Sequence, residues 1–429
     1  MNFFRSTCLA LIVGVAICCL AFSATADAVD LAIVGAKIYP SPTARPIENG
    51  AVVVHDGRIA AVGPASTTKI PAGATIVDGH GHVVTAGFWN CHVHILTHDL
   101  LHADQRSAAS LSHTLGAMLN QWGFTTVFDV ASVLDNTNVV RKRILSGEVQ
   151  GPNILTVGEP FYPPKGTPIY IRKFFADEHL ESAEVNSIPE ALAREKLEIE
   201  HGADGVKLFT GAIVGGDVGV LPMPLPMATA LVQQAHHYGK PVFAHPSNAQ
   251  GVNIAVDSGI DVLAHTAPMM GPWDAAFVKK LLDHHVALIP TLTLFEVEAK
   301  KFGESEADEA GDIAAAVQQL NAYSKAGGDI LFGTDVGYTE AYDTAEEYRL
   351  MNRAGMDYRA ILASMTTTPV KRFGNTSSKG RIATGMDADL VMLDADPAAD
   401  ITAFSRVDMT MRGGKVIFDR SAPTAPTAP

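Results

Sequence analysis

Cysteine is scarce in this chain of 429 residues, because it has four and three of them lie within the first 19 positions. Only Cys91 remains in the rest, so no disulfide can form there, and a hydrophobic core or bound metal has to stabilise the fold. Basic residues are also few: 32 Lys and Arg stand against 46 Asp and Glu, for a formal net charge of −14. This balance argues against a nucleic acid as the main partner.

Several catalytic signatures are absent as well. The chain has no Gly-x-Ser-x-Gly nucleophile elbow, no His-Glu-x-x-His zinc motif and no Gly-x-x-x-x-Gly-Lys phosphate loop. Hydrophobic residues make up 47% of the chain and charged residues 18%, a composition too apolar for a disordered protein. We therefore expect a large folded core whose chemistry comes from another set of side chains.

The first 26 residues have the composition of a secretory signal peptide. Arg5 precedes an apolar run from Leu9 to Phe22, and Ala24-Thr25-Ala26 fits a cleavage site. A membrane anchor is the alternative, but the run is shorter than the ~20 residues that a spanning helix needs. We expect residues 1–26 to be removed, the protein to be periplasmic or secreted, and no membrane segment to remain.

Both ends of the remaining chain are rich in short strand patterns. Asp56-Gly57 and Gly413-Gly414 each separate two apolar runs, as in β-hairpins. We predict that residues 27–85 and 380–421 form one small β-sandwich domain. Residues 422–429 repeat Ala, Pro and Thr and are predicted to be a disordered tail.

Between these ends, short apolar runs alternate with amphipathic helical stretches. Eight runs are strand candidates: Val83–Ala86, Thr125–Asp129, Ile154–Val157, Gly205–Leu208, Val242–Ala244, Val262–Ala264, Val286–Ile289 and Ile330–Phe332. Eight β/α units predict a (β/α)8 TIM barrel over residues 86–379, in an α/β fold. A doubly wound open sheet is the alternative, which the count of eight disfavours.

The strand ends carry side chains that can bind metal. His92 and His94 flank Val93 and face the same way in an extended segment. Lys207, His245, His265 and Asp335 stand at or just after four further strand candidates. Since the carboxyl ends of barrel strands meet at one mouth, all six are expected there. With 16 histidines in the chain, His-x-His alone is a weak signal.

Lys207 requires a separate explanation, because a cationic lysine cannot bind metal. Burial lowers the pKa of an amine, and a neutral amine can react with carbon dioxide to give an anionic carbamate. Such a carbamate could bridge two cations. An ordinary ion-paired lysine is the alternative.

A long connection from Glu159 to Asn186 shows no clear element and is expected to be a lid or binding loop. Surface decoration or an oligomer contact is an equal alternative. Its polar residues, together with one after Asp335, are candidates for binding a substrate carboxylate: Tyr162, Tyr170, Arg172, Lys173 and Tyr338.

The combined pattern resembles the amidohydrolase superfamily in its binuclear form, close to prolidase-like and imidazolonepropionase-like members and to ochratoxin-type amidases. The matching segments are 85–94, 202–207, His245, His265, 333–335 and 379–390. The resemblance implies two divalent metal ions, zinc by default, held by His92, His94 and Asp335 and by His245 and His265. It also implies a carboxylated Lys207 as bridge, a hydroxide between the metals as nucleophile, and Asp335 as catalytic proton shuttle.

The resemblance implies hydrolysis of dipeptides or N-acyl amino acids, small molecules with a free carboxylate. Asn248 stands where deaminases of the superfamily carry a glutamate, which favours amide hydrolysis over deamination. A lactonase or esterase using the same metals is the alternative, and a non-catalytic binding barrel is a third reading. A homo-oligomer is expected because relatives are often oligomeric.

Overall fold

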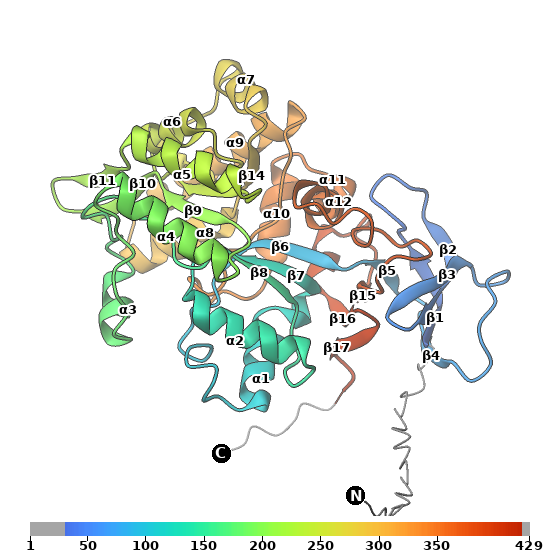
Figure 1. The fold of residues 1–429 in the computed structure, drawn as a ribbon. Helices are drawn as coiled ribbons and strands as arrows, with labels where there is room; N and C mark the ends of the chain where they lie inside the picture. Colours follow the sequence, from blue (N-terminus) through green and yellow to red (C-terminus); the bar gives the residue numbers. More distant parts are fainter. Residues whose placement is uncertain (1–30, 423–429) are drawn as a thin grey trace, which may run out of the picture.

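The structure is a computed structural model that describes residues 31–422 (Figure 1). The predicted signal peptide at residues 1–26 lies outside these residues, as does residue 423 onward of the predicted tail. Among residues 31–422, no helix combines the length and the apolar character needed to cross a bilayer. The fold is mixed α/β, with one sheet drawn from both ends of the chain and two parallel sheets between them.

The sheet shared by the two ends has eight strands in the order β17-β16-β15-β5-β1-β2-β3, with β4 also paired to β1. Its members are β1 (Leu31–Ile38), β2 (Ile47–His55), β3 (Arg58–Pro64), β4 (Thr75–Asp78), β5 (Val83–Ala86), β15 (Leu390–Leu393), β16 (Val407–Arg412) and β17 (Lys415–Asp419). Pairing of β15 with β5 joins the two ends. Both predicted hairpins are confirmed, at β2–β3 and β16–β17.

One strand prediction was wrong. Val83–Ala86 is not the first strand of the parallel region, because it pairs with β1 and with β15 in the terminal sheet. The parallel region begins after Gly87, at β6 (Phe88–Val93). A Cβ on Gly87 would lie 2.2 Å from the hydroxyl oxygen of Thr125, so a residue without a side chain suits this close passage between sheets. Val83–Ala86 was thus predicted correctly to be a strand, but it belongs to the sheet formed by the chain ends and not to the parallel region.

The middle of the chain forms two parallel sheets. One has the order β6-β7-β8 and the other β14-β13-β12-β9. Their further members are β7 (Phe124–Asp129), β8 (Asn153–Thr156), β9 (Val206–Phe209), β12 (Val242–His245), β13 (Val262–Ala264) and β14 (Ala287–Ile289). A separate hairpin, β10 (Gly211–Gly215) with β11 (Gly219–Pro222), follows β9.

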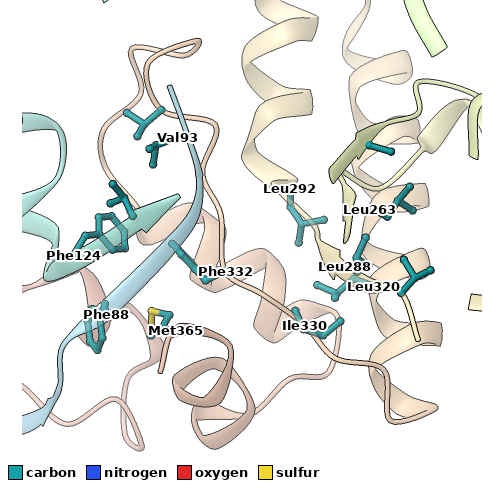
Figure 2. Packing of buried hydrophobic residues seen from close by; sticks show 14 of the residues in the cluster. Phe88, Val93, Phe124, Leu263, Leu288, Leu292, Leu320, Ile330, Phe332 and Met365 are labelled. Carbon is teal, nitrogen blue, oxygen red and sulfur yellow. The ribbon is translucent and has the colours of Figure 1, made fainter. Parts of the chain in front are cut away.

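Backbone hydrogen bonds connect the two parallel sheets on both sides. The Asp204 N–H donates to Thr156 O at 2.6 Å, beside β8 and β9. On the other side, Ile330–Phe332 makes only single bridges rather than a full strand. There the Leu331 N–H donates to Leu288 O, and the Cys91 N–H donates to Phe332 O at 2.7 Å. Figure 2 shows Phe332 and Ile330 between the residues around β6 and those around β14.

Helices follow most of the parallel strands and cover the sheets (Figure 1). They are α1 (Ala108–Met118), α2 (Leu134–Leu145), α3 (Arg172–Asp177), α4 (Ile188–Glu200), α5 (Leu225–His237), α6 (Ala249–Ser258), α7 (Ala275–Asp283), α8 (Leu292–Phe302), α9 (Glu306–Lys325), α10 (Ala345–Arg353), α11 (Tyr358–Met365) and α12 (Thr367–Arg372). Three short 3-10 helices complete the set: η1 (Asn120–Trp122), η2 (Pro268–Met270) and η3 (Ile401–Ser405). The long connection from Glu159 to Asn186, for which no helix or strand was predicted, contains α3.

Helix α4 carries a buried carboxyl group toward α5. Ser187 caps the helix by accepting a hydrogen bond from the Glu190 N–H. Glu195 is fully buried, accepts a hydrogen bond from the Gln234 side chain at 2.7 Å, and leaves its other oxygen without a partner among the described residues. Burial raises the pKa of Glu195 to about 8.

The burial of the Glu195 carboxyl group predicts that the stability of the protein falls as pH rises. Between the ordinary pKa of a glutamate and about 8, the folded protein holds a proton that the unfolded chain has released. The free energy of unfolding should therefore fall over this window, and Glu195→Gln should reduce the fall. Denaturant unfolding at pH 5 and pH 8.5 measures this change in the free energy of unfolding. Glu200→Gln, at an exposed position of α4, is the control. Equal pH dependence of both variants and the parent would contradict the prediction.

Candidate metal centre

The six predicted metal-binding residues lie together at one cavity. The cavity has a volume of about 890 Å³, and its lining includes all of them: His92, His94, Lys207, His245, His265 and Asp335. His92 lies near the end of β6, Lys207 lies on β9 and His245 is the last residue of β12. Because these strands are parallel, the three side chains lie at the same end of the sheets. The structure thus brings the predicted set together.

Asp335 lies at the centre of the histidines. Its Oδ1 is 2.7 Å from His94 Nε2 and 3.3 Å from His92 Nε2, and its Oδ2 is 3.9 Å from His265 Nε2. One ligand atom each from His92, His265 and Asp335 falls within 4.8 Å of the others. Burial opposes ionisation of Asp335, but its contacts with His92 and His94 outweigh burial and hold its pKa well below the usual range.

The protonation of these rings favours a bound cation. His94 Nδ1 lies 2.9 Å from the Ala131 carbonyl, which can only accept, so Nδ1 carries the proton. In a neutral ring the lone pair of Nε2 then faces the Asp335 carboxylate at 2.7 Å. Two lone pairs at this distance repel unless a cation or proton lies between them. Both ring nitrogens of His92 are buried and lack a hydrogen bond within the described chain.

Hydroxyl groups fix the position of the ring proton in His265 and His245 as well. The Thr291 hydroxyl donates to Pro290 O, so it must accept from His265 Nδ1 at 2.7 Å, which leaves the His265 Nε2 lone pair free. The Ser247 hydroxyl donates to Gly211 O, so it accepts from His245 Nε2 at 3.0 Å. That leaves Nδ1 of His245 as its ligand atom.

Burial keeps three of these imidazoles uncharged. It lowers the pKa of His92 and of His245 to about 3, and that of His265 well below its usual value. Neutral imidazole is the form that binds metal. The rings are also close: the centroids of His92 and His265 are 4.5 Å apart, and those of His245 and His265 are 4.8 Å apart.

Lys207 is buried in the same cluster. Its side chain is 1% exposed, and among residues 31–422 its Nζ has no hydrogen bond or ion pair. Burial lowers the pKa of Lys207 to about 7, against the attraction of Asp335. A large fraction of the amine is therefore neutral at neutral pH, the form that reacts with carbon dioxide. An ordinary ion-paired lysine does not fit these surroundings.

The backbone around the cluster adopts conformations that are rare for residues other than glycine. His265, Thr291 and Asp335 have φ values of 76°, 44° and 60°. Such strain is concentrated at functional sites. Two glycines permit close packing of this segment on β6: a Cβ on Gly333 would lie 2.7 Å from that of His92, and one on Gly337 would lie 2.0 Å from the His94 carbonyl oxygen.

The predicted substrate-binding residues divide into two groups. Tyr162, Tyr170 and Tyr338 line the cavity. Arg172 and Lys173 do not: both are exposed, Arg172 donates to Thr167 O, and Lys173 pairs with Asp177. Helix α3 turns these two cations outward, although its Phe174 and Phe175 line the cavity.

Sequence reasoning missed several residues at the site. Thr291 and Ser247 act on the ligand histidines through hydroxyl groups, and Glu298 and Lys301 bring charge to the cavity from α8. Serine and threonine are too common for spacing to single them out. Asn248, singled out by the sequence, caps α6 by accepting from the Gly251 N–H at 2.9 Å.

Comparison with known proteins identifies the family. The model of the Amidohydrolase family matches residues 83–417. The ochratoxinase of Aspergillus niger is 26% identical over 434 residues, which cover 92% of this chain and 88% of that protein.

Solved structures show the same fold. A putative prolidase from Bifidobacterium longum superimposes with a TM-score of 0.75 and 24% identity, over 91% of this chain and 94% of that one. A Xaa-Pro dipeptidase with bound methionine in its active site also superimposes with a TM-score of 0.75. It is 21% identical, over 90% of this chain and 99% of that one.

The contact between Thr291 and His265 predicts weaker metal binding when the hydroxyl is removed. Thr291→Val keeps the shape but leaves His265 Nδ1 without its acceptor, so metal affinity should fall by about 10- to 100-fold. Thr291→Ser keeps the hydroxyl and should bind like the parent protein. Competition with a chromophoric chelator measures the dissociation constant. Equal affinity of the Val and Ser variants would refute this role for Thr291.

Proposed function

Because this chain belongs to the amidohydrolase family, we propose that it is a metal-dependent amidase of dipeptides or N-acyl amino acids. It is a hydrolase that acts on C–N bonds of small molecules. The observation that carries the finer proposal is the buried cluster of neutral imidazoles around Asp335. The relatives named ochratoxinase and Xaa-Pro dipeptidase support this substrate class.

We infer that the cluster holds two divalent ions, zinc by default. His92, His94 and Asp335 would hold one, and His245 with His265 the other. Lys207, carboxylated, would bridge them, which its burial and lack of a partner in the described chain support. Histidine-rich sites suit zinc, while manganese, cobalt and iron use the same ligand types. Bound metals lower the pKa of water and polarise a carbonyl group.

Asp335 is assigned the proton transfers. Its carboxylate is ionised, buried and close to every ring of the cluster except His245, so it can accept the proton of an attacking water. The same oxygen can then give that proton to the leaving amine nitrogen. Burial of the surroundings strengthens these electrostatic effects, because little water remains to screen them.

We also infer that the two parallel sheets form one (β/α)8 barrel around this cluster. The backbone hydrogen bonds at Thr156–Asp204 and at Cys91–Phe332 support closure on both sides. In this reading Ile330–Phe332 is the eighth strand, reduced to one isolated bridge between Ile330 and Leu288, and Asp335 follows it in a left-handed backbone conformation. The sheet from the chain ends would be a second domain, a β-sandwich over residues 27–85 and 380–421.

Export and oligomer formation remain part of the proposal. The composition of residues 1–26 supports a cleaved leader and a periplasmic or secreted protein. N-terminal sequencing of the mature protein should then begin at Asp27. An N-terminus at Met1 would contradict export by this route. A homo-oligomer is expected from relatives and is tested by light scattering.

Metal content tests the binuclear centre. We expect about two metal ions per chain in the purified protein and a sharp fall in Lys207→Ala, because the bridging group is lost. Lys196→Ala, an exposed lysine on α4, should keep the parent content. Elemental analysis measures all three proteins. One metal per chain, unchanged without Lys207, would show that the lysine has no bridging role.

Substrate panels separate the amidase from its alternative. A lactonase or esterase would use the same ligands, so N-acyl amino acids and dipeptides should be compared with matched esters and lactones. Amine release from amides, lost in His92→Ala, is the expected result. Turnover of esters and lactones without any turnover of amides would favour the alternative.

A further inference from the structure

One face of helix α8 lines the cavity beyond the metal centre. Leu294, Glu298 and Lys301 all line it, at intervals of four and three residues that place them on the same side of a helix. The helix starts directly after Thr291, the residue that contacts His265. Glu298 follows seven residues later, which is about 10 Å of helix rise. This face therefore leads from the metal centre toward the cavity entrance.

Glu298 is a carboxyl group that forms no ion pair within the described chain, although the charge of Lys301 acts on it. It accepts a hydrogen bond from the Tyr338 hydroxyl at 3.2 Å through Oε1, and no partner of Oε2 occurs in the described chain. Lys301 lies 4.4 Å from the centre of the Tyr338 ring but forms no ion pair with Glu298. Burial raises the pKa of Glu298 to about 7. A nearby cation would relieve this cost of ionisation.

The ring of Tyr338, whose hydroxyl contacts this carboxyl group, packs against the ring of Tyr170. The centroids of Tyr170 and Tyr338 lie 5.1 Å apart, and both residues line the cavity with Glu298. A carboxylate beside aromatic faces is the chemistry that recognises ammonium and guanidinium groups. The same arrangement repels an anion, and the Tyr338 hydroxyl proton already points to Glu298.

Acidic side chains outnumber basic ones in the lining of the cavity, although burial raises the pKa of Glu198 to about 9, so this one is largely uncharged at neutral pH. Eight acidic side chains line it: Asp99, Asp135, Glu159, Glu181, Glu198, Glu298, Asp335 and Glu340. The lysines and arginines among the lining residues are Arg194, Lys207 and Lys301. Arg194 is already used, because its guanidinium donates to Pro160 and Ala183 carbonyls and lies 3.1 Å from Glu198.

We propose that Glu298 sets the substrate preference by binding a cationic group of the amide substrate against the rings of Tyr170 and Tyr338. This rests on the proposed amidase function and narrows it to substrates that carry an ammonium or guanidinium group. Two sources fit this chemistry: a basic side chain on the leaving amino acid, or the free amino terminus of a dipeptide.

Matched substrate pairs test the proposal. N-acyl lysine with a free side-chain ammonium is compared with N-acyl norleucine, and a dipeptide with its N-acetylated form. Glu298→Gln should lower kcat/KM for the cationic member of one pair by about 10- to 100-fold, mainly through KM, as for loss of a charged hydrogen bond. The neutral member should change little. The pair that responds identifies the source of the cation.

Two control variants separate charge from structure. Glu296→Gln makes the same change on α8 at a residue that pairs with Lys300 and does not line the cavity, so it should keep the parent preference. Tyr338→Phe removes the hydrogen bond but keeps the carboxyl group, so the preference for the cation should persist. An unchanged ratio of cationic to neutral substrate in Glu298→Gln, for both pairs, would overturn the proposal.

A binding measurement separates this proposal from the amidase function. If no amide is hydrolysed, the proposed function fails, and calorimetry with the metal-loaded protein still tests Glu298. Lysinamide with its α-amine acetylated and glycyl-glycinamide supply the two kinds of cation, and norleucinamide with its amine acetylated is the neutral probe. At least one cation should bind about tenfold more tightly than the neutral probe in the parent but not in Glu298→Gln. Equal binding of all three probes to the parent would refute cation recognition.

Discussion

Electrostatic frustration of the buried histidine cluster is the feature on which the rest of this site depends. Burial keeps His92, His245 and His265 neutral. Hydrogen bonds to Ala131, Thr291 and Ser247 fix the proton of His94, His265 and His245 on one ring nitrogen and leave a lone pair on the other. The lone pairs of His94 and His265 face the carboxylate of Asp335, and no proton lies between them. Divalent cations resolve this conflict, so the arrangement of these side chains favours metal binding.

The surrounding fold serves to hold this arrangement. Parallel strands bring His92, Lys207 and His245 to one end of two sheets, and hydrogen bonds between the sheets join their edges. The segment after Phe332 then crosses onto β6, with the Asp335 N–H donating to His92 O and the His94 N–H to Val336 O. Asp335 thus becomes a neighbour of His92 and His94, in a backbone conformation that is unusual for a residue other than glycine.

The sequence predicted that six side chains gather at one mouth, and they do line one cavity. This placement was predictable because each of them lies within, at the end of or just after an apolar run, a pattern that tolerates errors in the strand boundaries. It misassigned Val83–Ala86, since a short apolar run does not reveal which sheet it joins. It also placed cations of the long connection at the substrate, whereas the turn of α3 directs Arg172 to solvent. The sequence alone could not single out Thr291 and Glu298, because their roles come from tertiary contacts alone.

Anomalous X-ray diffraction from crystals of the metal-loaded protein tests the central claim most directly. Data collected on both sides of the metal absorption edge locate each ion without assumptions about the ligands. The account predicts two peaks beside Asp335, about 3.5–4 Å apart, with continuous density extending from Lys207 Nζ between them. A single peak, or ions bound away from the histidine cluster, would contradict it.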